Sequence, residues 1–146
     1  MARFERVVVA GTFNCIHQGH LKLLRTALEA GEKVVLGLTS DGFARRIKGT
    51  AKPYAERKRE LEVVIGDEMK RCEIVEIHDE IGIAGEEKEL QAIVVSTETE
   101  PNARKVNGAR KRKGLTALEV IVIPLVNDVE GRKLSCRRLA KKSGGA

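Results

Sequence analysis

The sequence is poor in aromatic residues, with one tyrosine, three phenylalanines and no tryptophan among 146 residues. Proteins that bind single-stranded nucleic acid stack bases on several aromatic side chains, so this composition disfavours that class. No apolar run approaches the roughly 20 residues that cross a bilayer. The early run "RVVVAG" is too short for a signal-peptide core, and no cleavage pattern follows it. We therefore expect a cytoplasmic protein that does not contact a membrane.

Cysteine is also scarce. Cys15, Cys72 and Cys136 are widely separated, odd in number and never arranged as CxxC. This pattern disfavours a disulfide framework and a cysteine-based zinc site.

The overall balance of residues is that of a globular protein. Hydrophobic residues make up 42% and charged residues 33% of the chain, unlike a disordered sequence. The length fits one domain, which we assign to residues 1–140, with a flexible polar tail at 141–146. Lysine and arginine exceed acidic residues by 27 to 21, a formal net charge of +6. This excess favours nucleic acid or a phosphate-bearing small molecule as partner, with a solvated basic surface as the alternative.

Five short runs rich in β-branched residues predict strands, at 6–10, 33–38, 72–77, 92–96 and 119–124. Four of them are almost continuously apolar, which is typical of strands buried on both faces of a parallel sheet. The run "CEIVEI" is more mixed and suits an edge strand.

Helical patterns separate these strands. We expect helices over 19–30, over 54–70 after Pro53, over a basic segment at 101–113, and over a short segment that begins near Ser135. The expected buried faces carry Leu21, Leu24 and Leu28 in the first helix, and Leu61, Val64 and Ile65 in the second. The alternation β-α-β-α-β-α-β-α-β-α predicts an α/β domain with one doubly wound, parallel, five-stranded sheet of Rossmann-like type.

The segment "GTFNCIHQGH" connects the first predicted strand to the first predicted helix. Ligands of open parallel sheets bind beyond the carboxyl ends of the strands, so this segment lies at the expected place. Gly11 allows close approach of the backbone, and Thr12 offers a hydroxyl group. Gly19 and His20 lie at the helix start, where free N–H groups favour an anion.

Two other interpretations of this segment stay open. Cys15, His17 and His20 could bind zinc, although no fourth ligand stands nearby. The histidines could also simply pack in the fold. The segment matches neither the Walker A pattern GxxxxGK[ST] nor GxGxxG, so those two nucleotide-binding classes are not indicated.

The same segment resembles the (G/S)-x-F-D-x-x-H-x-G-H signature of the nucleotidylyltransferase superfamily, whose members join a nucleotide to a phosphate-bearing partner. Residues 37–62, 92–115 and 120–140 resemble the archaeal and eukaryotic type of phosphopantetheine adenylyltransferase. The resemblance implies the nucleotidylyltransferase fold and a reaction of ATP with 4′-phosphopantetheine that yields dephospho-coenzyme A and pyrophosphate. It also implies direct in-line attack on the α-phosphorus, and Mg²⁺ carried with ATP rather than by a protein cage.

The resemblance further implies roles for single residues. His20 would be catalytic and would stabilise charge on the α-phosphate, while His17 would help to form the nucleotide pocket. Thr12 would contact the reacting phosphates, and Phe13 would pack near the nucleotide. The full expected ATP-binding set is Gly11, Thr12, Phe13, His17, His20, Asn107, Arg110, Ser135, Arg137 and Arg138.

The family also places a lysine against the incoming phosphate. Lys48 and Lys52 both lie in the matching basic segment; we favour Lys48 as the catalytic lysine, with a solvated lysine as the alternative for each. Arg57 is expected in the acceptor site, with a surface pair to a glutamate one helical turn away as the alternative. The full expected acceptor-binding set is Thr12, Lys48, Lys52, Arg57, Ser96, Thr97 and Thr99.

One residue and one segment depart from the family pattern. Asn14 stands where the signature has aspartate, which removes a carboxylate from a phosphate site. The segment "KLSCRRLA" aligns with I-S-S-T-R-I, so Cys136 and Arg137 replace a serine and a threonine whose hydroxyls bond the β- and γ-phosphates. Arg137 could supply charge instead.

Three functions are therefore compared. The first is adenylyl transfer to 4′-phosphopantetheine. The second is a sister nucleotidylyltransferase with FMN, nicotinamide mononucleotide or glycerol 3-phosphate as acceptor; its cytidylyl type ends in R-T-x-G-I-S-T-T, which "KLSCRRL" does not resemble. The third is a non-catalytic binder that uses the basic helix at 101–113 for nucleic acid or a protein, which the scarcity of aromatics disfavours for nucleic acid. The sequence predicts no particular oligomeric state.

Overall fold

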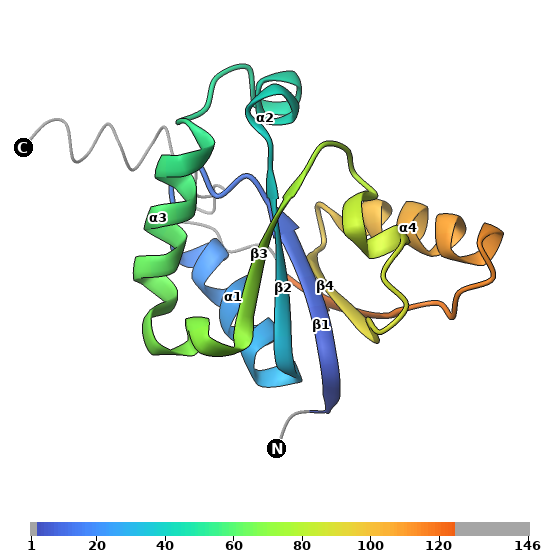
Figure 1. Ribbon diagram of the computed structural model, residues 1–146. Helices are drawn as coiled ribbons and strands as arrows, with labels where there is room; N and C mark the ends of the chain where they lie inside the picture. Colours follow the sequence, from blue (N-terminus) through green and yellow to red (C-terminus); the bar gives the residue numbers. More distant parts are fainter. Residues whose placement is uncertain (1–2, 125–146) are drawn as a thin grey trace, which may run out of the picture.

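The computed structural model describes residues 3–124 (Figure 1). Five strands form one parallel sheet in the order β3-β2-β1-β4-β5. The strands are β1 (Phe4–Gly11), β2 (Gly31–Thr39), β3 (Cys72–Ile77), β4 (Ala92–Ser96) and β5 (Glu119–Ile123). The expected helix near Ser135 and the expected tail at 141–146 lie outside the described residues.

Helices cover both faces of this sheet. The α-helices are α1 (Gln18–Ala30), α2 (Asp41–Lys48), α3 (Tyr54–Ile65) and α4 (Glu100–Arg112), and two 3-10 turns are η1 (Gly66–Arg71) and η2 (Gly82–Gly85). The helices α1 and α3 lie on one face of the sheet, and α4 and η2 lie on the other (Figure 1). Within residues 3–124, no helix has the length and apolar character that crossing a membrane requires.

The alternation of side chains along each strand supplies two cores. Val7 and Val9 of β1 pack with Leu24 of α1 and Leu61 of α3. Val8 lies between them in sequence, points to the opposite face and joins the cluster under α4. Because both faces of the central strands are buried, these strands read in the sequence as continuous apolar runs.

The predicted α/β class, the parallel sheet and the edge position of β3 are confirmed. The expected helix over 54–70 is wrong in its second part, because the α-helix ends at Ile65 and Gly66 adopts a positive φ of 64°. The helix implied between the third and fourth strands is only the single turn η2. Two residues of the expected apolar faces, Leu21 and Val64, are exposed.

Strand order reverses at β1, which lies between β2 and β4. The chain runs outward from β1 to β2 and β3, and then returns to the other side of β1 to form β4 and β5. Such a reversal leaves a crevice beyond the carboxyl ends of the two central strands, where ligands of this architecture bind.

Candidate active site

A cavity of about 850 Å³ lies at this reversal point, within the usual size range of small-molecule sites. One part of its wall is polar and carries Thr12, His17, His20 and Lys48. The remaining wall is largely apolar and comes from the ends of β1, β4 and β5, from η2 and from α4. It includes Val8, Ile81, Ile83, Ala84, Ile93, Val95, Val106 and Ile123.

The loop after β1 has an unusual backbone conformation. Phe13 has a φ of +47°, which is rare for a residue with a side chain, and its ring is fully buried in the core. That ring lies against Gly11, where an added Cβ would come within 3.1 Å of Phe13 Cε2. The glycine therefore makes room for the phenylalanine ring, a reason that is separate from the close ligand approach expected from the sequence.

The two histidines of the signature lie at the start of α1, stacked with ring centroids 4.0 Å apart. His17 is the N-cap of the helix, and its Nδ1 accepts a hydrogen bond from Gly19 N at 3.1 Å. Nδ1 of His20 lies 3.1 Å from Cys15 O and 3.4 Å from His17 N. These backbone contacts orient both rings on the cavity wall, so the histidines pack in the fold and also face the site. The zinc alternative finds no ligand set in the described part of the chain.

The two candidate lysines have different surroundings. Lys48, at the end of α2, lines the cavity. Lys52 does not line it, and its Nζ donates to the Glu60 carboxylate at 3.0 and 3.2 Å. The hydrogen bond to Glu60 raises the pKa of Lys52 above its usual value. Lys48 can therefore contact a ligand in the cavity, whereas the Lys52 ammonium group is hydrogen-bonded to Glu60 of the helix α3.

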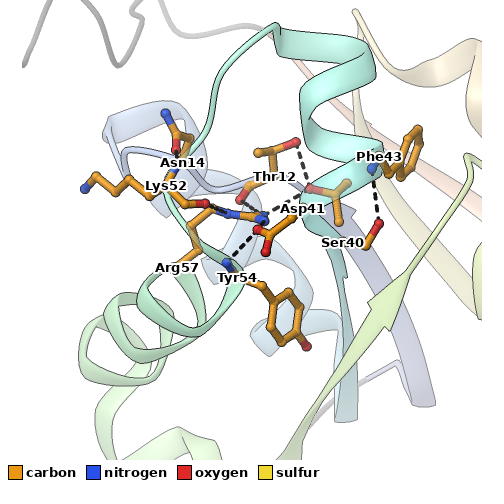
Figure 2. Close-up of polar contacts among 9 residues, drawn as sticks. Thr12, Asn14, Ser40, Asp41, Phe43, Lys52, Tyr54 and Arg57 are labelled. Carbon is orange, nitrogen blue, oxygen red and sulfur yellow. Dashed lines mark hydrogen bonds and ion pairs between the residues drawn. The ribbon is translucent and has the colours of Figure 1, made fainter.

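Asn14, the first departure from the signature, binds the loop that carries Lys52. Its Oδ1 accepts a hydrogen bond from Lys52 N at 2.6 Å (Figure 2). An amide oxygen serves this contact as a carboxylate oxygen would, so the change from aspartate keeps an acceptor at this point.

Arg57 projects from α3 into the space between the loop after β1 and the end of β2 (Figure 2). Its guanidinium is fully buried and donates to Lys52 O at 2.7 Å, and to Thr12 O, Thr39 Oγ1 and Asp41 Oδ1 at 3.1 Å each. Within residues 3–124 its ion-pair partner is Asp41 rather than a glutamate, and the side chain is not on the cavity wall. A direct contact of Arg57 with the acceptor stays a prediction.

The side chains of Asn107 and Arg110, both expected to bind ATP, bond to the backbone of neighbouring segments. Asn107 exchanges two hydrogen bonds with the backbone of Leu118, at 3.1 and 2.7 Å. Arg110 is fully buried and donates to the carbonyls of Thr116, Ala84 and Glu87 at 2.7 to 2.9 Å, and burial lowers its pKa. Neither residue lines the cavity, because their side chains tie α4 to the segments packed against it.

The loop after β4 reaches the cavity in part. Ser96 and Thr99 line it and bond to each other, with Ser96 N donating to Thr99 Oγ1 at 3.0 Å. Thr97 is not on the wall, and its backbone N–H donates to Ile123 O at 3.0 Å. Ser135, Arg137 and Arg138 lie outside the residues that the structure describes.

The sequence interpretation missed several polar residues at this end of the sheet. Thr39 lines the cavity, and Asp41 accepts from Arg57 Nη2. Glu80, Glu98 and Asn102 also line it. One signal was readable: Thr39, Ser40 and Asp41 are consecutive polar residues directly after a buried strand, at the edge where ligands bind.

An open parallel sheet with a cavity at its reversal point is the architecture of doubly wound α/β proteins, which bind ligands beyond the carboxyl ends of their strands. The cytidylyltransferase-like family matches residues 8–138. Two curated relatives named phosphopantetheine adenylyltransferase are similar over most of the chain. The protein from Methanopyrus kandleri is 44% identical over 95% of this chain and 90% of its own length, and that from Thermococcus kodakarensis is 43% identical over 91% and 82%.

A solved structure agrees with this similarity. A protein of unknown function from Archaeoglobus fulgidus superimposes with a TM-score of 0.74 at 26% identity, over 89% of this chain and 99% of that one. The chain belongs to the cytidylyltransferase-like family and, within it, to the phosphopantetheine adenylyltransferases.

Proposed function

We propose that this enzyme transfers the adenylyl group of ATP to 4′-phosphopantetheine, giving dephospho-coenzyme A and pyrophosphate in coenzyme A biosynthesis. One observation carries the proposal: the signature residues Thr12, His17 and His20 share the wall of one cavity with Lys48. The names of the relatives support the choice of substrates. Because ATP is an intracellular substrate, we infer a cytoplasmic location.

The reaction forms one bond and breaks one at the same phosphorus. An oxygen of the pantetheine phosphate attacks the α-phosphorus of ATP, and the bond to the β-phosphate oxygen breaks to release pyrophosphate. Negative charge grows on the α-phosphate and on the leaving group, so the protein accelerates the step by position and by positive or hydrogen-bonding groups. We assign His20 and the hydroxyl of Thr12 to the α-phosphate, and Lys48 to the incoming phosphate.

A divalent cation accompanies ATP in reactions of this kind and neutralises part of the charge of the triphosphate. Glu80 and Glu98 are carboxylates on the cavity wall, and no three metal-ligating side chains converge among residues 3–124. This donor set fits a cation held mainly by phosphate oxygens. We infer that the cation is Mg²⁺.

The contacts of the basic side chains on and next to α4 give little support to the alternative that this helix binds nucleic acid. Two of its exposed basic side chains have carboxylates nearby: Arg104 Nη2 lies 4.0 Å from Glu100, and Lys105 Nζ lies 3.7 Å from Glu80. Directly after the helix, Lys113 Nζ lies 3.8 Å from Glu86. Such pairs reduce the positive potential that would attract a nucleic acid.

Pyrophosphate release in the presence of ATP, Mg²⁺ and one acceptor at a time tests the proposal. We expect release with 4′-phosphopantetheine and none with FMN, nicotinamide mononucleotide or glycerol 3-phosphate. His20→Ala should lower kcat by about 100-fold or more, the size seen when a transition-state donor is lost. His78 is exposed and does not line the cavity, so His78→Ala is the matched control.

Two results would count against this function. One is the absence of pyrophosphate release from the unmodified protein while a related enzyme works in parallel. The other is equal turnover in His20→Ala and His78→Ala.

A further inference from the structure

We propose that Arg57, acting through Thr39, directs the hydroxyl hydrogen of Thr12 into the cavity, where it donates to a phosphate oxygen of the substrate. The inference rests on the proposed function, because it specifies how one residue of that site works. It makes Arg57 and Thr39 positioning residues for Thr12, although neither Thr39 nor its contact with Arg57 was expected from the sequence.

The direction of the hydrogen bonds follows from the chemistry of the guanidinium and from the geometry of the two hydroxyls. A guanidinium can only donate, so the 3.1 Å contact from Arg57 Nη1 makes Thr39 Oγ1 an acceptor. Thr39 Oγ1 donates its single hydroxyl hydrogen to Thr12 Oγ1, also at 3.1 Å. Thr12 Oγ1 accepts in turn, which leaves its own hydrogen to be donated elsewhere.

The remaining direction for that hydrogen is the cavity. Thr12 is buried but lies on the cavity wall. Within residues 3–124, Thr12 Oγ1 has no acceptor for its hydrogen. A phosphate oxygen of a bound substrate supplies one. Because the Thr12 hydroxyl already accepts from Thr39, its hydrogen is oriented before the substrate binds and can donate to the phosphate oxygen without reorientation.

Burial of the arginine strengthens this arrangement. The Arg57 side chain is 0% exposed, whereas its partner Asp41 is 46% exposed and partly solvated. Water therefore screens the carboxylate more than the guanidinium, and the threonine hydroxyls lie on the side of the buried positive charge. Hydrogen bonds in a chain that starts at a charged donor polarise one another in the same direction. The same Nη1 also donates to Thr12 O at 3.1 Å, which fixes the peptide that carries the hydroxyl.

A double-mutant cycle tests this relay, by which we mean the chain of hydrogen bonds from Arg57 through Thr39 to Thr12. The variants are Thr39→Val, Thr12→Val and the double variant, each assayed for kcat and KM with ATP and 4′-phosphopantetheine. Thr39→Val keeps the shape of the side chain and removes the hydroxyl, and we expect about a tenfold loss of kcat/KM, the size of one well-placed hydrogen bond. In the Thr12→Val background the same change should cost less than about twofold, because the hydroxyl that it orients is gone.

Two further variants separate positioning from stability. Thr39→Ser restores the hydroxyl and should recover kcat/KM to within about threefold of the unmodified enzyme. Ser40 is the next residue, also buried, and its Oγ caps α2 by accepting from Phe43 N at 3.1 Å without lining the cavity. Ser40→Ala should therefore lower thermal stability and leave kcat/KM within about threefold. Should Thr39→Val not fold, Thr39→Ala removes the same hydroxyl with a smaller side chain.

Calorimetric titration of the same proteins with ATP gives a readout that does not depend on turnover. The relay predicts weaker ATP binding in Thr39→Val when Thr12 is present and no further weakening when it is absent. Additive losses in the cycle, or unchanged binding and turnover in Thr39→Val, would overturn the relay. The proposed function alone would be overturned by a different result: ATP binding shows the predicted coupling between Thr39 and Thr12, but the unmodified enzyme releases no pyrophosphate.

Discussion

Replacement of Arg57 by lysine is expected to destabilise the protein by about 2–4 kcal/mol, from the loss of hydrogen bonds to two buried acceptors. Arg57 reaches four acceptors that lie on different sides of its planar group. A lysine has one nitrogen at the end of its side chain and cannot span them. The ion pair with Asp41 can persist, since that carboxylate is about half exposed.

The magnitude follows from the two acceptors that water does not reach. Thr12 O and Thr39 Oγ1 belong to residues that are only 6% and 3% exposed, so each loses its charged donor without replacement. An unsatisfied buried acceptor costs about 1–3 kcal/mol, and we take about 1–2 kcal/mol for each of the two because the Thr39 hydroxyl keeps its hydrogen bond to Thr12 Oγ1. The total remains below the roughly 5–15 kcal/mol of stability that domains possess, so the variant should fold. At about 3 °C per kcal/mol for a chain of this size, Tm should fall by about 6–12 °C.

Urea denaturation followed by circular dichroism measures this loss directly. Arg59→Lys is the matched control, because Arg59 lies two residues away on α3 and is exposed. We expect the control to change the free energy of unfolding by less than about 0.5 kcal/mol. A loss below about 1 kcal/mol in Arg57→Lys would contradict this prediction, because it would mean that the buried contacts of Arg57 contribute no more than a surface residue.

Three other predictions concern single groups. Lys48→Ala should raise KM for 4′-phosphopantetheine or lower kcat by about tenfold or more, whereas Lys52→Ala, which removes an exposed ion pair with Glu60, should stay within about threefold. Tyr54 is the one tyrosine of the chain, and burial raises its pKa above 10; alkaline titration of the tyrosinate absorbance should therefore show later ionisation in the folded than in the denatured protein, and the free energy of unfolding should fall as pH rises past 10. Arg110→Lys should lower the melting temperature without changing KM for ATP, and a raised KM would instead place this side chain at the triphosphate.

The strands were predictable because their burial leaves a direct mark on the sequence. The runs at 92–96 and 72–77 coincide with β4 and β3. The helix α2 was missed because its eight residues, "DGFARRIK", begin with an acidic residue and a glycine and contain three basic side chains. Its start was nevertheless marked by Ser40, a residue type that favours helix N-caps.

The site was predictable where one continuous segment forms it and unpredictable where distant segments meet. Thr12, His17 and His20 belong to one loop and helix start, so their common placement follows from the motif. In the sequence, Arg57 cannot be distinguished from the other charged residues of a polar helix. Its burial depends on acceptors from Thr39 and from three other positions that only the folded chain brings together.

The most direct test of the proposed function follows the α-phosphorus itself. ATP labelled at the α-phosphate is incubated with the enzyme, Mg²⁺ and 4′-phosphopantetheine, and the products are separated and identified by mass. Adenylyl transfer predicts that the label appears in dephospho-coenzyme A and that the released pyrophosphate is unlabelled. Label that stays in ATP, or that leaves as free AMP without formation of dephospho-coenzyme A, would contradict it.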